Sequence, residues 1–182
     1  SDAEDVLRKL KELIDRDTKE NDEVLRKHKR LTDEDRRKNE EVVRELRKII
    51  TRLDEKLRAE GKELVDEVAK EVDKVVKDVE RLLDESHEEN KEVNRDLKRL
   101  LDESSKKVEK IIREVEEEAR RLDKEVLDRI RDLLRRWRER NEESRRRAEK
   151  SIRDSDETNK RSREEIKRII RKLREILKER KR

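Results

Sequence analysis

The sequence predicts an all-α protein, a long and nearly straight antiparallel three-helix bundle with helices of about 60 residues. One observation is that the 182 residues include one Gly and no Pro, so the residues that usually interrupt helices are almost absent. A second is that hydrophobic residues make up 28% of the chain and charged residues 60%. This apolar share is close to the two in seven, roughly, that a coiled-coil seam needs. The third observation is periodicity, which separates a bundle from a disordered chain of the same composition.

Apolar residues recur every 18 residues along the chain. One such row contains Val65, Leu83, Leu101 and Ala119. Eighteen residues make five turns of an α-helix at about 3.6 residues per turn. A strict heptad would impose a left-handed supercoil and an 11-residue repeat a right-handed one. The spacing therefore predicts helices that are nearly straight.

The single glycine marks the expected end of the first helix. Glycine often follows a helix C-terminus because it adopts the left-handed backbone conformation without steric cost. Gly61 therefore predicts a turn at about residues 59–62 and a first helix over about 2–59. Ser1 and Glu4 have the spacing of a capping box, in which side chains bond the free amides at a helix start.

A second turn is expected near residue 121, because equal helices divide the chain there. The second helix then covers about 62–120 and the third about 123–181, with Asp123 as its N-cap. Two alternatives remain. The 18-residue register continues through Asp123, which favours one longer helix, and the polar segments 31–35 and 154–158 are candidates for turns that would leave Gly61 inside a helix.

Equal thirds form a single bundle domain over 1–182 in which polar residues meet at the same levels. Folding the chain at about residues 61 and 122 brings His28 beside Asn94, and it places other polar positions together between apolar ends. The acidic second helix also suits the basic third one, because residues 61–122 hold 15 basic and 20 acidic groups and residues 123–182 hold 24 and 15. The candidate site residues are these polar core positions: Asn21, His28, Thr32, Asn39, Ser86, Asn90, Asn94, Ser104, Asn141, Ser144, Ser155, Thr158 and Asn159.

Buried polar residues of this kind favour a role in pairing specificity. A buried amide or hydroxyl without a partner costs about 1–3 kcal/mol, so each one penalises a register that leaves it unpaired. The amides would thereby fix which helix faces which, and at what height.

The two histidines allow sharper hypotheses. His28 lies in the row Leu10–His28–Leu46 and is expected to point inward, whereas His87 lies at the edge of the seam. The folding separates them by about 10 Å along the axis, and inward carboxylates are missing, so no metal site is expected. A buried neutral His28 that loses its place on protonation would make a pH switch, which circular dichroism during acid titration of the protein and of a His28→Asn variant would test.

Other classes of function lack their usual signals. The sequence has no Gly-rich phosphate loop and no nucleophile elbow, so we expect neither an enzyme nor a cofactor. Basic and acidic residues are interleaved and Trp137 is the only aromatic residue, which argues against nucleic-acid binding. No apolar run is long enough for a membrane span. The sequence shows no targeting signal, so it does not indicate a compartment. We expect a soluble protein.

The 18-residue apolar rows, the surface of Glu, Lys and Arg, and the Ser, Asn, His and Thr residues at core positions carry a resemblance. The chain resembles de novo designed helical bundles built on parametric backbones with buried hydrogen-bond networks. The resemblance covers the whole chain and is one of style. It implies a structural scaffold without natural biochemical activity, whose polar core serves specificity.

We expect a monomer that requires no partner. The alternative is an interaction module or switch, which supplies helices to a larger homo- or hetero-oligomeric assembly or opens, on acidification for example, to bind a partner helix. A half-polar core motivates this alternative because it lowers the cost of opening.

Overall fold

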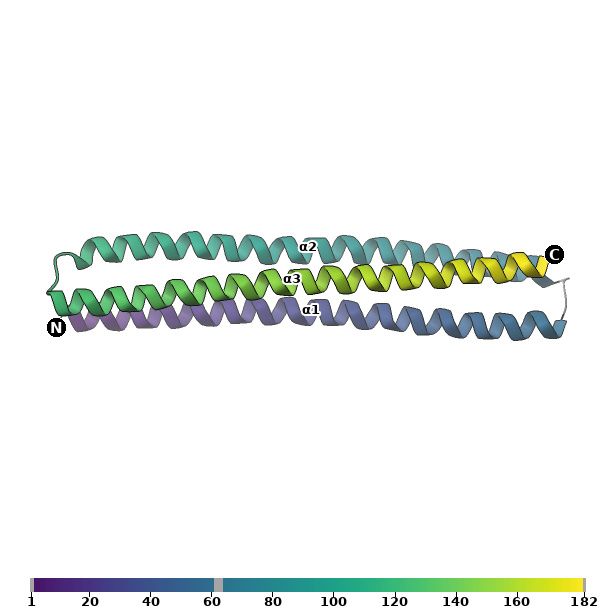
Figure 1. The fold of residues 1–182 in the computed structure, drawn as a ribbon, viewed down its shortest axis with the longest axis horizontal. Coiled ribbons are helices and arrows are strands. Elements are labelled where there is room, and N and C mark those ends of the chain that lie inside the picture. The colour runs from purple at the N-terminus through teal and green to yellow at the C-terminus, as the bar shows by residue number, and fades with distance from the viewer. Residues whose placement is uncertain (1, 61–63, 182) are drawn as a thin grey trace. The chain divides into compact units, whose positions relative to one another are not determined.

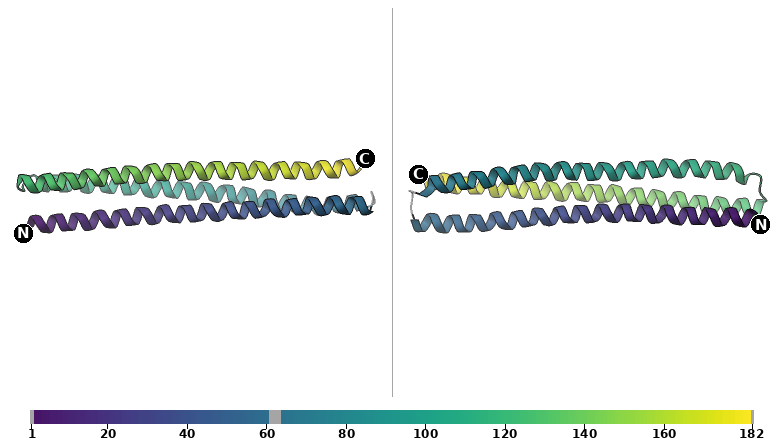
Figure 2. Two further views of the ribbon diagram at one scale, coloured as in Figure 1. Left: turned by 60° about the horizontal axis from the view of Figure 1, so that its bottom comes forward. Right: turned by 180° about the vertical axis from the view of Figure 1, so that it is seen from behind.

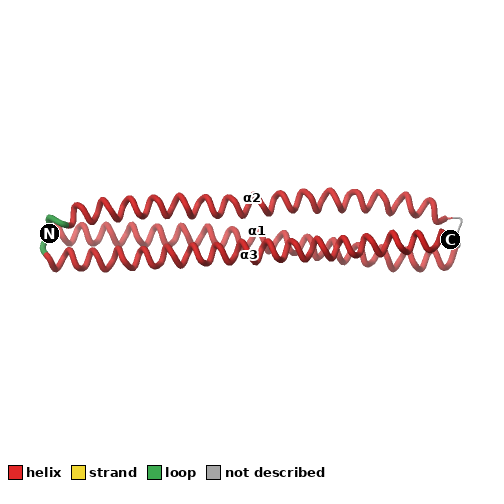
Figure 3. Tube along the Cα trace, turned by 45° about the horizontal axis from the view of Figure 1, so that its top comes forward, coloured by secondary structure: helices red, strands yellow, loops and turns green. Residues whose placement is uncertain are grey.

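The described residues form three long α-helices (Figures 1 and 3). The computed structural model describes residues 2–60 and 64–181, and no strand occurs among them. The helices are α1 (Asp2–Glu60), α2 (Val65–Ala119) and α3 (Lys124–Lys181), of 59, 55 and 58 residues. The expected spans were about 2–59, 62–120 and 123–181. The predicted fold class, an all-α antiparallel three-helix bundle, is confirmed.

The second connection lies where the equal division of the chain places it. Helix α2 ends in a turn in which the amide of Leu122 donates to the carbonyl of Ala119 at 3.0 Å. The first bond of α3 runs from the amide of Leu127 to the carbonyl of Asp123 at 2.9 Å, so Asp123 occupies the N-cap position. The alternative of one unbroken helix through Asp123 is wrong. The turn expected at Gly61 and the capping box expected at Ser1 lie outside the described residues.

Helices α1 and α3 continue through the two polar segments that were the other candidates for turns. Residues 31–35 are helical within α1, and residues 154–158 are helical within α3. The alternative topology with turns there is therefore wrong. Each helix has acidic residues in its first turn, where they stabilise the positive end of the helix dipole: Asp2, Glu4 and Asp5 in α1, Asp66 and Glu67 in α2, and Glu125 in α3.

The three helices divide into two compact units. Unit 1 consists of Ser1–Arg30 and Val93–Arg153, and unit 2 consists of Leu31–Glu92 and Asp154–Arg182. Each unit contains a segment of every helix, and the segments of unit 1 lie side by side in both views of Figure 2. The expectation of one domain over 1–182 stays a prediction.

The core of unit 1 is built from inward positions of all three helices. Leu10 and Ile14 of α1 pack with Ile112 of α2 and with Ile130 and Leu134 of α3. Ile112 and Ile130 are fully buried. A second cluster in the same unit contains Leu97, Leu101 and Ala148. These residues lie in the 18-residue rows, so helical periodicity alone places them on the inner faces.

The core of unit 2 follows the same rule with a different composition. Its α2 segment contributes mostly valines: Val65, Val68, Val72, Val76 and Val79. Leucines and isoleucines of α1 and α3 pack against them: Leu46, Leu53, Leu57, Ile166, Ile169, Ile170, Leu173 and Leu177. Burial of these branched side chains is the main stabilising contribution in this unit, at about 25 cal/mol for each Å² of apolar surface removed from water.

Side-chain contacts fix the helix directions inside each unit. In unit 1, Asp17 contacts Ser104 and Trp137 whereas His28 contacts Asn94 and Ser151, so advancing along α1 means going back along α2 and forward along α3. In unit 2, the α1–α3 contacts Asp35–Asn159 and Arg47–Glu165 advance together along both helices. The α2–α3 contacts Glu80–Arg174 and Asn90–Ser155 run in opposite order. Both units therefore have the up-down-up arrangement.

Candidate functional site: buried polar contacts between the helices

All thirteen polar positions singled out in the sequence are at least partly buried. Eight are buried: Asn21, His28, Asn39, Asn90, Asn94, Asn141, Ser155 and Asn159. Five are partly buried: Thr32, Ser86, Ser104, Ser144 and Thr158. They do not form one cluster, because hydrogen bonds gather them into separate levels within each unit.

His28 forms a level that joins all three helices of unit 1. Its Nε2 lies 2.7 Å from Oδ1 of Asn94 in α2, and its Nδ1 lies 3.0 Å from Oγ of Ser151 in α3. An amide oxygen only accepts, so Nε2 carries the proton and donates to it. The Ser151 hydroxyl then donates to the bare Nδ1. Both ring nitrogens are satisfied, and the imidazole is 3% exposed.

Asp17 forms a second level in unit 1 that joins the three helices. Its Oδ1 accepts from the Ser104 hydroxyl of α2 at 3.3 Å, and its Oδ2 accepts from Nε1 of Trp137 in α3 at 2.8 Å. The same hydroxyl lies 3.3 Å from Oδ1 of Asn21. Trp137 is buried in the apolar cluster, and its indole N–H also reaches this carboxylate.

Asn141 has only half of its hydrogen bonds. Its Nδ2 donates to Oγ of Ser105 at 3.3 Å, and its Oδ1 is buried without a hydrogen-bond partner among the described residues. Folding the chain at about residue 122 would place Asn141 beside Ser104, the neighbour of its actual acceptor. A missing bond to a buried carbonyl costs stability, so this level is less favourable than the His28 level.

Asp35 forms the equivalent level in unit 2. Its Oδ1 accepts from the Ser86 hydroxyl of α2 at 2.7 Å, and its Oδ2 accepts from Nδ2 of Asn159 in α3 at 3.2 Å. A carboxylate accepts strongly, so bonds of this type are about twice as strong as those between neutral groups. Asp17 and Asp35 therefore play the same role, 18 residues apart on α1.

Asn90 joins α2 and α3 in unit 2. Its Oδ1 accepts from the hydroxyl of Ser155 at 2.7 Å, and its Nδ2 donates to a carboxylate oxygen of Asp156 at 3.4 Å. Of the remaining candidates, Thr32 is partly buried. The side chains of Asn39, Ser144 and Thr158 make no hydrogen bond within residues 2–60 and 64–181.

Several partners in these levels were absent from the candidate set: Asp17, Asp35, Ser105, Ser151 and Asp156. For three of them the signal was present in the sequence. Asp17 and Asp35 continue the 18-residue row that ends at the buried Leu53, and Ser151 lies between Leu133 and Ile169 in another row. Charged and hydroxyl side chains at those positions look like surface residues unless the row is followed.

Ion pairs lie on the outside of both units and contribute less to stability than the buried polar levels do. Arg138 of α3 bonds through Nε and Nη2 to the two carboxylate oxygens of Glu109 in α2, at 3.1 and 3.3 Å. This hydrogen bonding, with the carboxylate charges of Glu109 and Glu116, raises the pKa of Arg138 against the opposing effect of burial. The hydrogen bond from Arg135 lowers the pKa of Asp132. Exposed pairs such as these contribute little to stability, because solvent screens the charges and holding two long side chains in one geometry costs entropy.

The described part of the chain contains neither a candidate metal-binding group nor a candidate membrane-spanning helix. No group of three or more His, Cys, Asp or Glu side chains is placed there to hold a metal ion. None of the helices there is long and apolar enough to cross a bilayer.

Comparisons with known proteins identify the fold but no natural family. No protein-family model and no curated protein matches the chain. Among solved structures, the chain is similar to a computationally designed three-helix bundle, with 17% identity and a TM-score of 0.63. The match covers 98% of this chain and 88% of that one. At this identity the likeness shows a shared three-helix fold.

Proposed function

We propose that the protein is a designed structural scaffold, without natural biochemical activity, whose helix pairing is specified by hydrogen-bonded polar levels in its core. The observation that carries this proposal is that three side chains of α1 each bond to both other helices. They are Asp17 and His28 in unit 1 and Asp35 in unit 2. The similarity to a designed three-helix bundle and the absence of a matching natural family support the origin.

The connections explain why such levels are needed. Four residues separate α1 from α2 and four separate α2 from α3, so short connections restrict how far consecutive helices slide. Helices α1 and α3 have no direct connection. Their pairing depends on side chains, and apolar rows that repeat every 18 residues do not distinguish one register from another. A polar residue that loses its partner in a wrong register penalises that register.

The test is a variant in which two levels are made apolar. The substitutions are His28→Leu, Asn94→Leu, Ser151→Ala, Asp35→Leu, Ser86→Ala and Asn159→Leu. Replacing all three members of each level together leaves none of them with an unpaired partner inside the level, so we expect resistance to denaturant to stay equal or to rise. We expect the variant to populate more than one helix register or oligomeric state. These would appear as extra amide peaks in nuclear magnetic resonance spectra or as species above the 22.4 kDa mass of one chain.

A matched control replaces hydroxyls that make no hydrogen bond with any described residue, through Ser144→Ala and Thr158→Val. This control should keep one set of amide peaks and the monomer mass that we propose for the native chain. An apolar variant with one set of peaks and one mass would show that the polar levels do not specify pairing, and the proposal would fail.

A further inference from the structure

A groove runs between α1 and α2 in unit 2. Its wider part, of about 570 Å³, is lined by residues between 35 and 49 of α1 and between 75 and 89 of α2. A narrower part of about 220 Å³ continues toward residue 56 of α1 and residue 68 of α2, and the two parts share Ile49 and Val75. Together they follow α1 for about 30 Å, at about 1.5 Å per residue.

The walls of this groove carry apolar side chains at heptad spacing. Val42 and Ile49 are seven residues apart on α1, and Val75 and Leu82 are seven residues apart on α2. Leu82 is 48% exposed, more than the other exposed large hydrophobic residues of the described chain, Leu31 and Leu100. Rows of this spacing are typical of seams that receive a further helix.

An unsatisfied amide opens into the same groove. Asn39 is 5% exposed, lines the wider part and makes no hydrogen bond with any described residue. Asn39 is one of the residues that line the wider part, so a group lying there would come close to this side chain. The neighbouring Asp35 and Ser86 bond to each other. A buried amide in this position has donors and an acceptor available for an incoming polar group.

The charge of the groove is uneven. Acidic residues dominate the wider part, where Glu41, Glu45, Glu85 and Glu89 line the groove with Lys38 as the only base. Within residues 2–60 and 64–181, Glu41 and Glu89 have no ion pair or hydrogen bond. The narrower part is lined by two basic residues, Arg52 and Lys56, and one acid, Glu71.

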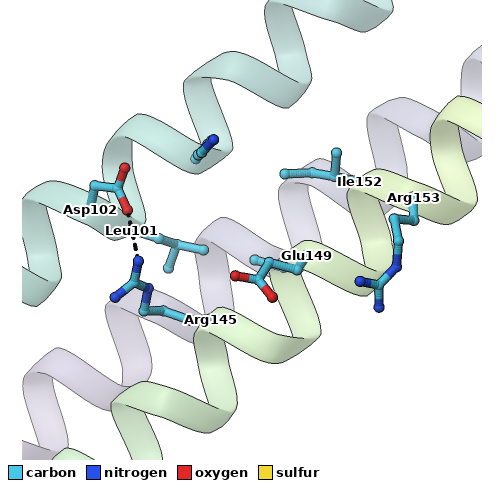
Figure 4. Close-up of a pocket in the computed structure, with 8 residues that line it drawn as sticks. Leu101, Asp102, Arg145, Glu149, Ile152 and Arg153 are labelled. Atoms are coloured by element: carbon cyan, nitrogen blue, oxygen red, sulfur yellow. Dashed lines mark hydrogen bonds and ion pairs between the residues drawn. The ribbon is translucent and has the colours of Figure 1, made fainter.

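The groove between α2 and α3 in unit 1 has none of these features (Figure 4). Arg145 of α3 reaches across it to Asp102 of α2, and the two side chains pair at 3.3 Å. Its other lining charges, among them Glu149 and Arg153, are of both signs. The Arg145–Asp102 pair spans this groove with two charges that already satisfy each other.

We propose that the α1/α2 groove of unit 2 binds an amphipathic α-helix of another protein. The charge pattern defines this partner as a helix of about 22 residues with an apolar heptad row, basic residues at the end that faces Glu41 and Glu89, and acidic residues at the end that faces Arg52 and Lys56. A polar residue within its apolar row would bond to Asn39. The bundle stays closed, so binding does not require the helices to separate.

Fluorescence anisotropy with the full-length protein tests this proposal. The probe is a labelled 22-residue peptide, roughly the groove's length, with Leu at the heptad core positions, Lys on the flanks of one half and Glu on the flanks of the other. We expect saturable one-to-one binding. Leu82→Glu should weaken binding about tenfold or more, because a charge replaces apolar contact area at the centre of the groove. Leu100→Glu is the matched control, since Leu100 is 43% exposed but lies in unit 1, and should bind as the native protein does.

Charge is tested separately. The double variant Glu41→Lys/Glu89→Lys should bind the peptide more weakly, and its binding should depend less on salt concentration. A peptide whose lysines are replaced by Glu should bind the native protein at least about tenfold more weakly. Circular dichroism verifies that each variant is helical, and Leu82→Ala replaces Leu82→Glu if the latter loses helix. The proposal fails if binding is not saturable, or if Leu82→Glu and Leu100→Glu weaken it equally. It also fails if the acidic peptide binds as tightly as the original peptide. A dimer of the protein itself that depends on Leu82, seen by sedimentation, would overturn it as well.

Discussion

His28 and Asn39 lie eleven residues apart on α1 and are buried to the same degree, at 3% and 5% exposure. His28 has a partner on each of the other helices, whereas Asn39 has no hydrogen-bond partner among the described residues. The difference lies in the facing helix. The pairing of Asp35 with Ser86 in the same unit implies that Asn39, four residues further along α1, faces α2 near Leu83, a buried core residue that lines the same groove. A polar residue at an inward position therefore becomes a pairing contact only where its neighbours are polar too.

The largest effect that this comparison predicts is for His28→Leu. The substitution removes both hydrogen bonds of the ring and takes partners from a buried carbonyl and a hydroxyl, so we expect a loss of about 1–3 kcal/mol in the free energy of unfolding. Chemical denaturation followed by circular dichroism measures it. The effect should be seen at neutral pH with an unchanged denaturant slope. A loss below about 0.5 kcal/mol would mean that the two contacts contribute no more than surface substitutions do.

A double-mutant cycle sharpens the interpretation of that loss. His28→Leu and Asn94→Leu should each destabilise the protein, and the double variant should lose less than the sum by about 1–2 kcal/mol, because the contact between the two residues can be lost only once. The same denaturation experiment on four proteins gives the coupling energy. Strict additivity would show that the 2.7 Å contact does not couple the two side chains.

Asn39→Leu should have the opposite sign. No hydrogen bond to a described residue is lost, and an apolar side chain suits the apolar lining of the groove around it, which includes Leu83, so we expect the free energy of unfolding to rise by up to about 1 kcal/mol. Asn21→Leu is the matched control, because Asn21 is equally buried on α1 but accepts a bond from Ser104. The control should destabilise. If Asn39→Leu destabilises as much as Asn21→Leu, the comparison between satisfied and unsatisfied positions is broken.

The smallest effect is expected on the surface, for Asp132→Asn. The hydrogen bond from Arg135 lowers the folded-state pKa of Asp132 below the ordinary value of 3.8, so the ionised carboxylate favours folding. Its contribution is present above pH 3.8 and disappears as the pH falls through the lowered pKa. Thermal unfolding at pH 7 should show a slightly lower midpoint for the variant. In strongly acidic buffer the two midpoints should coincide, and a difference that persists there would assign the effect to something other than charge.

The sequence identifies the inward faces and the polar positions, but it does not give the partner of each position. The pairing of His28 with Asn94 follows from folding the chain at Gly61, and these two side chains are hydrogen-bonded in the structure. The offset of one residue between Ser104 and Ser105 as the partner of Asn141 does not follow, because folding by index sums ignores side-chain direction. The acidic partners Asp17 and Asp35 were missed because carboxylates on a highly charged chain are far more often solvated.

The sequence by itself determined the helical fold, the equal division of the chain and the inward rows, because helix formation and amphipathic periodicity are local properties of consecutive residues. Tertiary structure decided which buried polar groups are satisfied and which are left open to a groove. Whether a buried polar group is satisfied depends on which side chain of another helix lies within hydrogen-bonding distance of it. The periodicity of one helix does not contain this information. The satisfied level at His28 and the open amide at Asn39 have the same appearance in the sequence and opposite consequences in the fold.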